Sequence, residues 1–144
     1  KNLIMYKLLF LLFFLISLNV NSGELKIVQY KDNFCYDGDT CYAILDGVPE
    51  GLEYVRVRIR GIDTPEIKGK CKAERELAQK AKSYINTSIR EAHVITLRNL
   101  EWGKYGGRIV ADLYIDNTNY LKYIENEKFY VLYNGGKKVK DWCK

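Results

Sequence analysis

The chain of 144 residues has little histidine and little proline, and its four cysteines include no CxxC pair. With His93 as its only histidine, a zinc site is a weak interpretation. Two prolines, no low-complexity tract and 47% hydrophobic residues argue against a disordered chain. The length is typical of one domain. The composition therefore predicts a single folded domain without structural zinc.

The sequence also lacks an apolar run of the roughly 20 residues that a membrane-spanning helix needs. Its longest such run, from Leu8 to Leu18, follows a basic residue and precedes the small residues Val20 and Ser22. This pattern is typical of a signal peptide over residues 1–22 with cleavage after Ser22, and an uncleaved N-terminal anchor is the alternative. We therefore expect residues 23–144 to form a secreted or periplasmic domain.

A large excess of charge of one sign is absent as well. The 23 lysines and arginines exceed the 18 acidic residues by five. Loss of residues 1–22 removes two lysines and no acid, so 21 basic residues remain and the net charge falls to +3. Such a small excess does not by itself indicate a nucleic-acid partner, which must be argued from the placement of the charges.

Four cysteines in an exported chain suggest disulfide bonds. Cys35 and Cys41 flank the turn sequence "YDGDT" and could face each other across a hairpin. Cys71 would then pair with Cys143. Of the three possible connectivities we favour this one.

Hydrophobic periodicity and turn residues predict an α+β domain. We expect strands at residues 25–30, 41–45, 54–62, 93–100 and 108–116, a helix at 71–92 and a short helix at 119–127. The turn at "YDGDT" should use Gly38 in a conformation with positive φ. One long helix after the third of five strands fits a five-stranded OB-type β-barrel with a short helix near the C-terminus.

The third expected strand carries the strongest pattern, "YVRVRIRGIDTPE" from Tyr54 to Glu66. Alternation places Val55, Val57 and Ile59 on the core face and Arg56, Arg58 and Arg60 on the other. Arg58 precedes Asp63 by five residues, about 16 Å along a straight strand. The two can share a site only if the chain bends at Gly61.

Asp39 and Asp63 each lie where an expected strand meets a tight turn. Asp39 and Asp63 repel each other unless a cation lies between them, and oxygen ligands favour Ca²⁺ or Mg²⁺. A backbone carbonyl near Thr64 could complete the set, and Glu66 could act as a general base on a nearby water. The alternatives are an ordinary polar hairpin turn at "DGDT" and a surface salt bridge for Glu66.

Other side chains suit a nucleic acid. The arginine fork binds phosphate through two parallel hydrogen bonds, which makes Arg58 and Arg108 candidates. Exposed rings in glycine-rich loops could stack on bases, which makes Tyr105 and Tyr133 candidates. Lysines in loops could follow a phosphate backbone, and these are Lys104, Lys137 and Lys138. For most of these residues a solvated surface is the alternative.

The motifs "DGDT" (37–40), "RIRGIDTPE" (58–66) and "KYGGRIVAD" (104–112), in this order, resemble the thermonuclease (staphylococcal nuclease-like) family. The resemblance implies an OB barrel, a Ca²⁺ cofactor, monomeric action on DNA and RNA with little sequence preference, and 3′-phosphate products. By position it implies these roles: calcium ligands Asp39, Asp63 and the Thr64 carbonyl; water activation by Glu66; phosphate binding by Arg58 and Arg108; nucleotide contact by Lys104, Tyr105 and Tyr133.

We therefore expect an enzyme, a calcium-dependent phosphodiesterase. A catalytically inactive OB-fold module that binds single-stranded nucleic acid is the main rival, and an anchored surface protein that uses a metal only for stability is a third possibility. The intact set of three acids and two arginines favours the enzyme, because a binding module has no need of all five.

Overall fold

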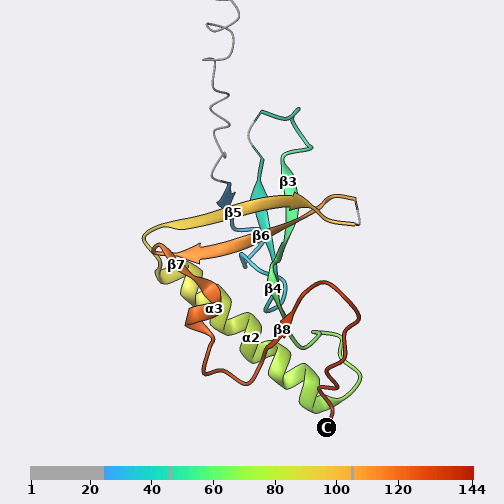
Figure 1. Cartoon of the computed structure of the whole chain (residues 1–144). Helices are drawn as coiled ribbons and strands as arrows, with labels where there is room; N and C mark the ends of the chain where they lie inside the picture. The colour runs from blue at the N-terminus through green and yellow to red at the C-terminus, as the bar shows by residue number, and fades with distance from the viewer. Residues whose placement is uncertain (1–24, 46, 105) are drawn as a thin grey trace, which may run out of the picture.

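The computed structural model describes residues 25–45, 47–104 and 106–144 (Figure 1). The expected signal peptide, residues 1–22, lies outside the described residues. Among the residues that are described, no helix combines the length and apolar character needed to cross a membrane.

Eight strands and two helices make up the described fold. They are β1 (Lys26–Ile27), β2 (Thr40–Ile44), β3 (Tyr54–Ile59), β4 (Gly61–Asp63), α2 (Lys72–Glu91), β5 (Ile95–Trp102), β6 (Arg108–Ile115), β7 (Thr118–Asn119), α3 (Tyr120–Tyr123) and β8 (Val131–Tyr133). The first strand and the second helix are shorter than the sequence pattern predicts, and β4, β7 and β8 were not expected as separate strands.

The main sheet curls into the predicted OB-type barrel. Its strands run in the order β1-β2-β3-β6-β5, and all neighbours are antiparallel except β3 and β6, which are parallel. A bridge between Leu25, just before β1, and Leu97 in β5 joins the two edges of the sheet. The barrel is thereby closed, and α2 packs below it (Figure 1).

The alternation along β3 is as predicted. Val55, Val57 and Ile59 are buried in the core, whereas the arginines lie on the other face. Burial of each aliphatic side chain stabilises the fold by about 1.5–3 kcal/mol. The prediction of one strand from 54 to 62 was wrong in one respect: Gly61 adopts a φ of 89°, which only glycine takes without strain, and the chain bends there. After the bend, β4 pairs with β8 instead of continuing the barrel.

The helix α2 packs one face against the barrel. Ala81, Ile85 and Ile89 are buried as the periodicity predicts. The same spacing of three and four residues predicts that Ala73 is the first buried residue of this face, but Ala73 is exposed and the neighbouring Glu74 is buried. The helix therefore begins by burying a carboxylate, which needs partners at that position.

Two close connections place the "DGDT" turn against this helix. A Cβ at Gly38 would lie only 2.8 Å from the Cβ of Ala81 and 2.8 Å from Cγ2 of Thr64, so no larger residue fits. The expected positive φ at Gly38 was wrong, because the glycine is needed here for close packing. Asn86 accepts hydrogen bonds from the backbone N–H groups of Phe34 and Cys35 and thereby joins α2 to the loop before the turn.

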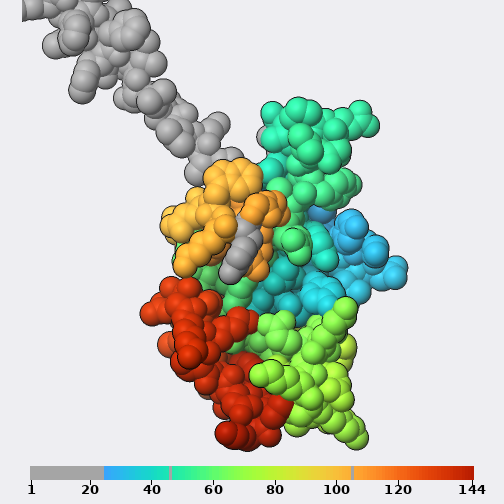
Figure 2. Space-filling model, turned by 90° about the vertical axis from the view of Figure 1, so that its right-hand side faces the viewer, coloured from blue at the N-terminus to red at the C-terminus, as the bar shows by residue number. Residues whose placement is uncertain are grey.

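Both predicted disulfides are present. Cys35 is bonded to Cys41 across the turn, and Cys71 is bonded to Cys143, which ties the N-terminal end of α2 to the C-terminal segment. Figure 2 shows this segment lying against the residues around the start of α2.

Candidate active site

Arg58 joins the two predicted carboxylates. Its Nη1 lies 2.7 Å from Oδ2 of Asp39, and its Nη2 lies 3.6 Å from Oδ1 of Asp63. Nη2 also donates a 2.8 Å hydrogen bond to the carbonyl of Ile62, which becomes possible because the chain bends at Gly61. All three ionic groups are nearly buried, and removal of one partner from such an arrangement costs about 3–5 kcal/mol.

Asp39 is held rigidly by the segment that carries Asp63. Its Oδ2 accepts hydrogen bonds from the backbone N–H of Thr64 at 3.0 Å and from the Thr64 hydroxyl at 2.9 Å. Its Oδ1 accepts one from the Thr40 hydroxyl at 3.1 Å. Thr64 thus ties the turn after Cys35 to the corner after β4, which brings the carboxylates of Asp39 and Asp63 into one cluster.

Glu66 reaches the same cluster through a lysine. Nζ of Lys138 lies 2.7 Å from Oδ1 of Asp63 and donates a 2.7 Å hydrogen bond to Oε1 of Glu66. Burial of the lysine lowers its pKa, but the contacts with Asp63 and Glu66 outweigh burial, so the pKa of Lys138 lies above its ordinary value. The side chain of Glu66 is half exposed, at 54%.

Asp37 is a member of the cluster that the sequence interpretation missed. It is 6% exposed, and its Oδ1 accepts a hydrogen bond from the backbone N–H of Asp39. Burial, followed by the charges of Asp39 and Glu66, raises the pKa of Asp37 to about 7. The signal that could have revealed it is its position two residues before Asp39 in the same tight turn.

Glu74 is a second acid that the sequence interpretation missed. It is buried, and its carboxylate accepts hydrogen bonds from the backbone N–H of Lys70 at 2.8 Å and of Glu66 at 3.4 Å. A Cβ at Gly69 would collide with the carboxylate of Glu74. Glu74 therefore holds the loop that presents Glu66, and Gly69 leaves the room for it.

Arg108 opens β6 on the same face of the sheet as Arg58. It pairs with Arg56 across the parallel strands, whereas Val110 pairs with Arg58. Directly paired residues project to the same side of the sheet, so Arg108, Arg56, Val110 and Arg58 share one face. Arg108 lies two residues, about 7 Å, before Val110, the residue opposite Arg58. Arg108 therefore lies on the sheet face that carries Arg58, level with Arg56.

The aromatic and lysine candidates fall into different places. The ring of Tyr133 in β8 lies 5.7 Å from the guanidinium carbon of Arg58, within the range of a cation–π contact. Lys104 is exposed in the loop between β5 and β6, and Tyr105 lies outside the described residues. Lys138, for which the sequence left a phosphate contact and a solvated surface as alternatives, contacts the two carboxylates.

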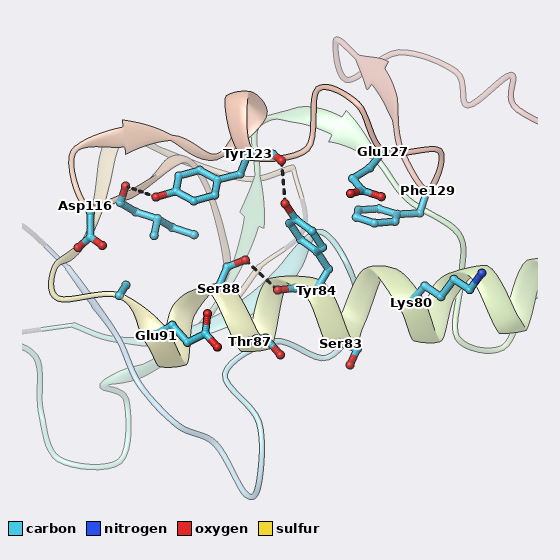
Figure 3. Close-up of a pocket in the computed structure, with 12 residues that line it drawn as sticks. Lys80, Ser83, Tyr84, Thr87, Ser88, Glu91, Asp116, Tyr123, Glu127 and Phe129 are labelled. Carbon is cyan, nitrogen blue, oxygen red and sulfur yellow. Dashed lines mark hydrogen bonds between the residues drawn. The ribbon is translucent and has the colours of Figure 1, made fainter.

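A cavity of about 450 Å³ opens beside the cluster. Its lining includes Asp63, Tyr133, Lys137 and Lys138. A larger cavity of about 750 Å³ lies elsewhere, along α2, where Tyr84 and Phe129 line it and Ser88 donates to the Tyr84 carbonyl (Figure 3). None of the predicted site residues lines the larger cavity, so its size does not identify it as the reactive site.

The donor set suits a hard cation. Asp39, Asp63 and Glu66 contact two cationic groups, Arg58 and Lys138. Asp37 is buried nearby, and burial first, then the charges of Asp39 and Glu66, raise its pKa. Carboxylate and carbonyl oxygens are the ligands of Ca²⁺ and Mg²⁺. Asp39, Asp63 and the carbonyl of Thr64 are the groups that could hold such an ion.

A comparison with protein families agrees with this geometry. The sequence model described as "Staphylococcal nuclease homologue" matches residues 56–127, which is half of the chain. The chain belongs to the staphylococcal nuclease homologue family. The match contains Arg58, Asp63, Glu66 and Arg108, whereas Asp39 lies before the matched residues. No curated protein matches the chain significantly.

Membership of the staphylococcal nuclease homologue family agrees with the closed OB-type barrel and with the long helix after the third barrel strand. It also places the carboxylate cluster in a family of the nuclease type, for which nucleic acid is the implied substrate. The segment from β8 to the C-terminus, which supplies Tyr133 and Lys138, lies beyond the matched residues.

Proposed function

We propose that the protein is a calcium-dependent nuclease that hydrolyses phosphodiester bonds of DNA and RNA with little sequence preference and leaves 3′-phosphates. The observation that carries the proposal is the contact of one guanidinium, that of Arg58, with two buried carboxylates, Asp39 and Asp63. This contact places Arg58, which can bind a phosphate, next to Asp39 and Asp63, which can hold a cation, and phosphodiester hydrolysis needs both groups at one site.

Each residue has a role that follows from its chemistry. Asp39, Asp63 and the Thr64 carbonyl would hold calcium, which when bound opposes the negative charge that develops on the phosphate oxygens. Arg58 donates to the same oxygens, and loss of one such donor typically costs about 2.7–4 kcal/mol of transition-state stabilisation. Glu66 accepts a proton from the attacking water or orients that water.

The remaining residues would bind the substrate. Arg108, on the same sheet face as Arg58, would contact the phosphate from its other side. The ring of Tyr133 would support the nucleotide next to Arg58. Lys104 and Tyr105 are proposed to contact the nucleic acid from the loop between β5 and β6, and the protein is proposed to act as a monomer.

Cleavage of single-stranded DNA by the purified chain, with disulfides formed, tests the proposal. The reaction is run with Ca²⁺, with Mg²⁺ and with chelator, beside Glu66→Gln and the matched control Glu125→Gln, an exposed acid of the segment after α3. We expect cleavage only with Ca²⁺, a loss of at least about 100-fold in Glu66→Gln and none in the control. Tight binding of DNA without cleavage in any metal would instead identify an inactive binding module.

We further propose that the protein is exported after cleavage behind Ser22. The apolar run from Leu8 to Leu18 and the two disulfides support this, because disulfides persist in oxidising compartments. Sequencing of the mature N-terminus should find Gly23 in protein recovered from the medium or the periplasm. Recovery of the intact N-terminus in the membrane fraction would favour an anchored form.

A further inference from the structure

The C-terminal segment, residues 134–144, is attached to the active site at both ends. At its start, β8 pairs with β4, so that Tyr133 faces Gly61 and Val131 faces Asp63. At its end, Cys143 is bonded to Cys71, five residues after Glu66. Figures 1 and 2 both show this segment running beside the start of α2.

Between these two attachments, the segment places one ammonium group inside the carboxylate cluster. Nζ of Lys138 lies 2.7 Å from Asp63 and 2.7 Å from Glu66, although 72 residues separate Lys138 from Glu66. The Asp63 side chain is only 4% exposed, so it has little access to other counter-charges. Its other described ionic contact, with Arg58, is longer at 3.6 Å.

We propose that Lys138 is a positioning residue that acts as a built-in counter-cation: it occupies Asp63 and Glu66 in the metal-free protein and competes with calcium for Asp63. This inference rests on the proposed function. The ammonium group and a divalent cation repel each other, so each lowers the affinity of the Asp63 carboxylate for the other. Lys138 therefore weakens metal binding, and a bound metal displaces it from Asp63.

The disulfide makes this competition effective. A free amine at low concentration would not compete with a divalent ion, but a tether at both ends keeps the ammonium of Lys138 at high effective concentration. Opening Cys71–Cys143 would leave the segment attached only at β8 and would allow Lys138 to leave the cluster. Lys138, when displaced, is free to meet the phosphate backbone that the same site would bind.

Calorimetric titration of the full chain with CaCl₂, disulfides formed, tests this role. Lys138→Met should bind Ca²⁺ roughly threefold to tenfold more tightly than the unchanged chain. Lys138→Arg, which keeps the charge, should bind like the unchanged chain. Lys140→Met is the matched control: it removes the same charge from the same segment, at a lysine that lies over the ring of Trp142, and should change the affinity little.

A variant without the disulfide tests the tether, and an unfolding measurement tests whether Lys138→Met is folded. Cys71→Ser/Cys143→Ser should tighten calcium binding in the same direction as Lys138→Met. Thermal unfolding in chelator should show that Lys138→Met is folded.

An affinity for Ca²⁺ that is equal or lower in Lys138→Met, with binding intact in the unchanged chain, would overturn the inference and leave the proposed function standing. Failure of both proteins to bind Ca²⁺ would overturn both. If Lys138→Met instead lost affinity only for a DNA oligonucleotide, Lys138 would be a substrate contact and the competition would be refuted.

Discussion

Replacement of Asn86 by alanine should remove the side chain that fastens α2 to the loop in front of the carboxylate cluster. Asn86 is 3% exposed. Its carbonyl oxygen accepts from the N–H groups of Phe34 and Cys35 at 2.8 and 2.9 Å, and its amide donates to the Cys35 carbonyl at 3.0 Å. Alanine leaves all three backbone groups without this partner, and the two groups of Cys35 are buried.

The magnitude follows from these three hydrogen bonds. Each contributes about 1 kcal/mol net, and a buried group left unpaired costs about 1–3 kcal/mol. We therefore expect Asn86→Ala to lower the free energy of unfolding by about 3–4 kcal/mol, a large share of the 5–15 kcal/mol that is typical of domains. The fourth bond, to the Lys82 carbonyl, is left out of this estimate because that carbonyl lies within the helix.

Urea unfolding followed by far-ultraviolet circular dichroism measures this loss. Thr87→Ala is the matched control, because Thr87 is the next residue of the same helix and is exposed. The control should stay within about 0.5 kcal/mol of the unchanged protein. A loss below about 1 kcal/mol in Asn86→Ala, no different from the control, would refute the argument that this side chain holds the loop.

Two further predictions concern acids outside the metal cluster. Glu74→Gln should lower the rate of DNA cleavage and reduce stability by about 1–2 kcal/mol, because an amide cannot accept from both Glu66 and Lys70; unchanged cleavage and unfolding would contradict this. Hydrogen bonds from the backbone N–H of Val94 and from that of the preceding residue, His93, lower the pKa of Asp116 below its usual 3.8. Because the pKa of Asp116 is lower in the folded than in the unfolded protein, its stabilising effect is present above pH 3.8 and is lost as the pH falls through the folded-state pKa. Urea unfolding should therefore show that Asp116→Asn is less stable than the unchanged protein at pH 7, and that the difference in unfolding free energy is smaller at pH 3. An equal difference at both pH values would count against this prediction.

Local sequence patterns were enough to predict most strands, the long helix and the chemistry of the site residues. Alternation in Tyr54–Ile59 predicted which side chains are buried, since a strand turns successive residues to opposite faces. The cysteine spacing favoured the two disulfides that the structure contains. Three ordered motifs predicted the family that the comparison confirmed, because the acids and arginines of the site sit next to turns that are recognisable locally.

Which distant groups come into contact depends on how the whole chain packs. The bend at Gly61 brings Asp63 back to Arg58, and no periodicity predicts the angle of a bend. Asn86 and Glu74 look like surface residues in the sequence but are buried with backbone partners that the helix reaches only after packing.

Lys138 is the clearest case of a contact that the sequence could not predict. The sequence suggested either a phosphate contact or a solvated surface for it. It contacts carboxylates instead, because β8 and the Cys71–Cys143 bond direct the C-terminal segment past the site. Local patterns depend on neighbours a few residues apart, whereas a contact across 72 residues depends on the path of the whole chain.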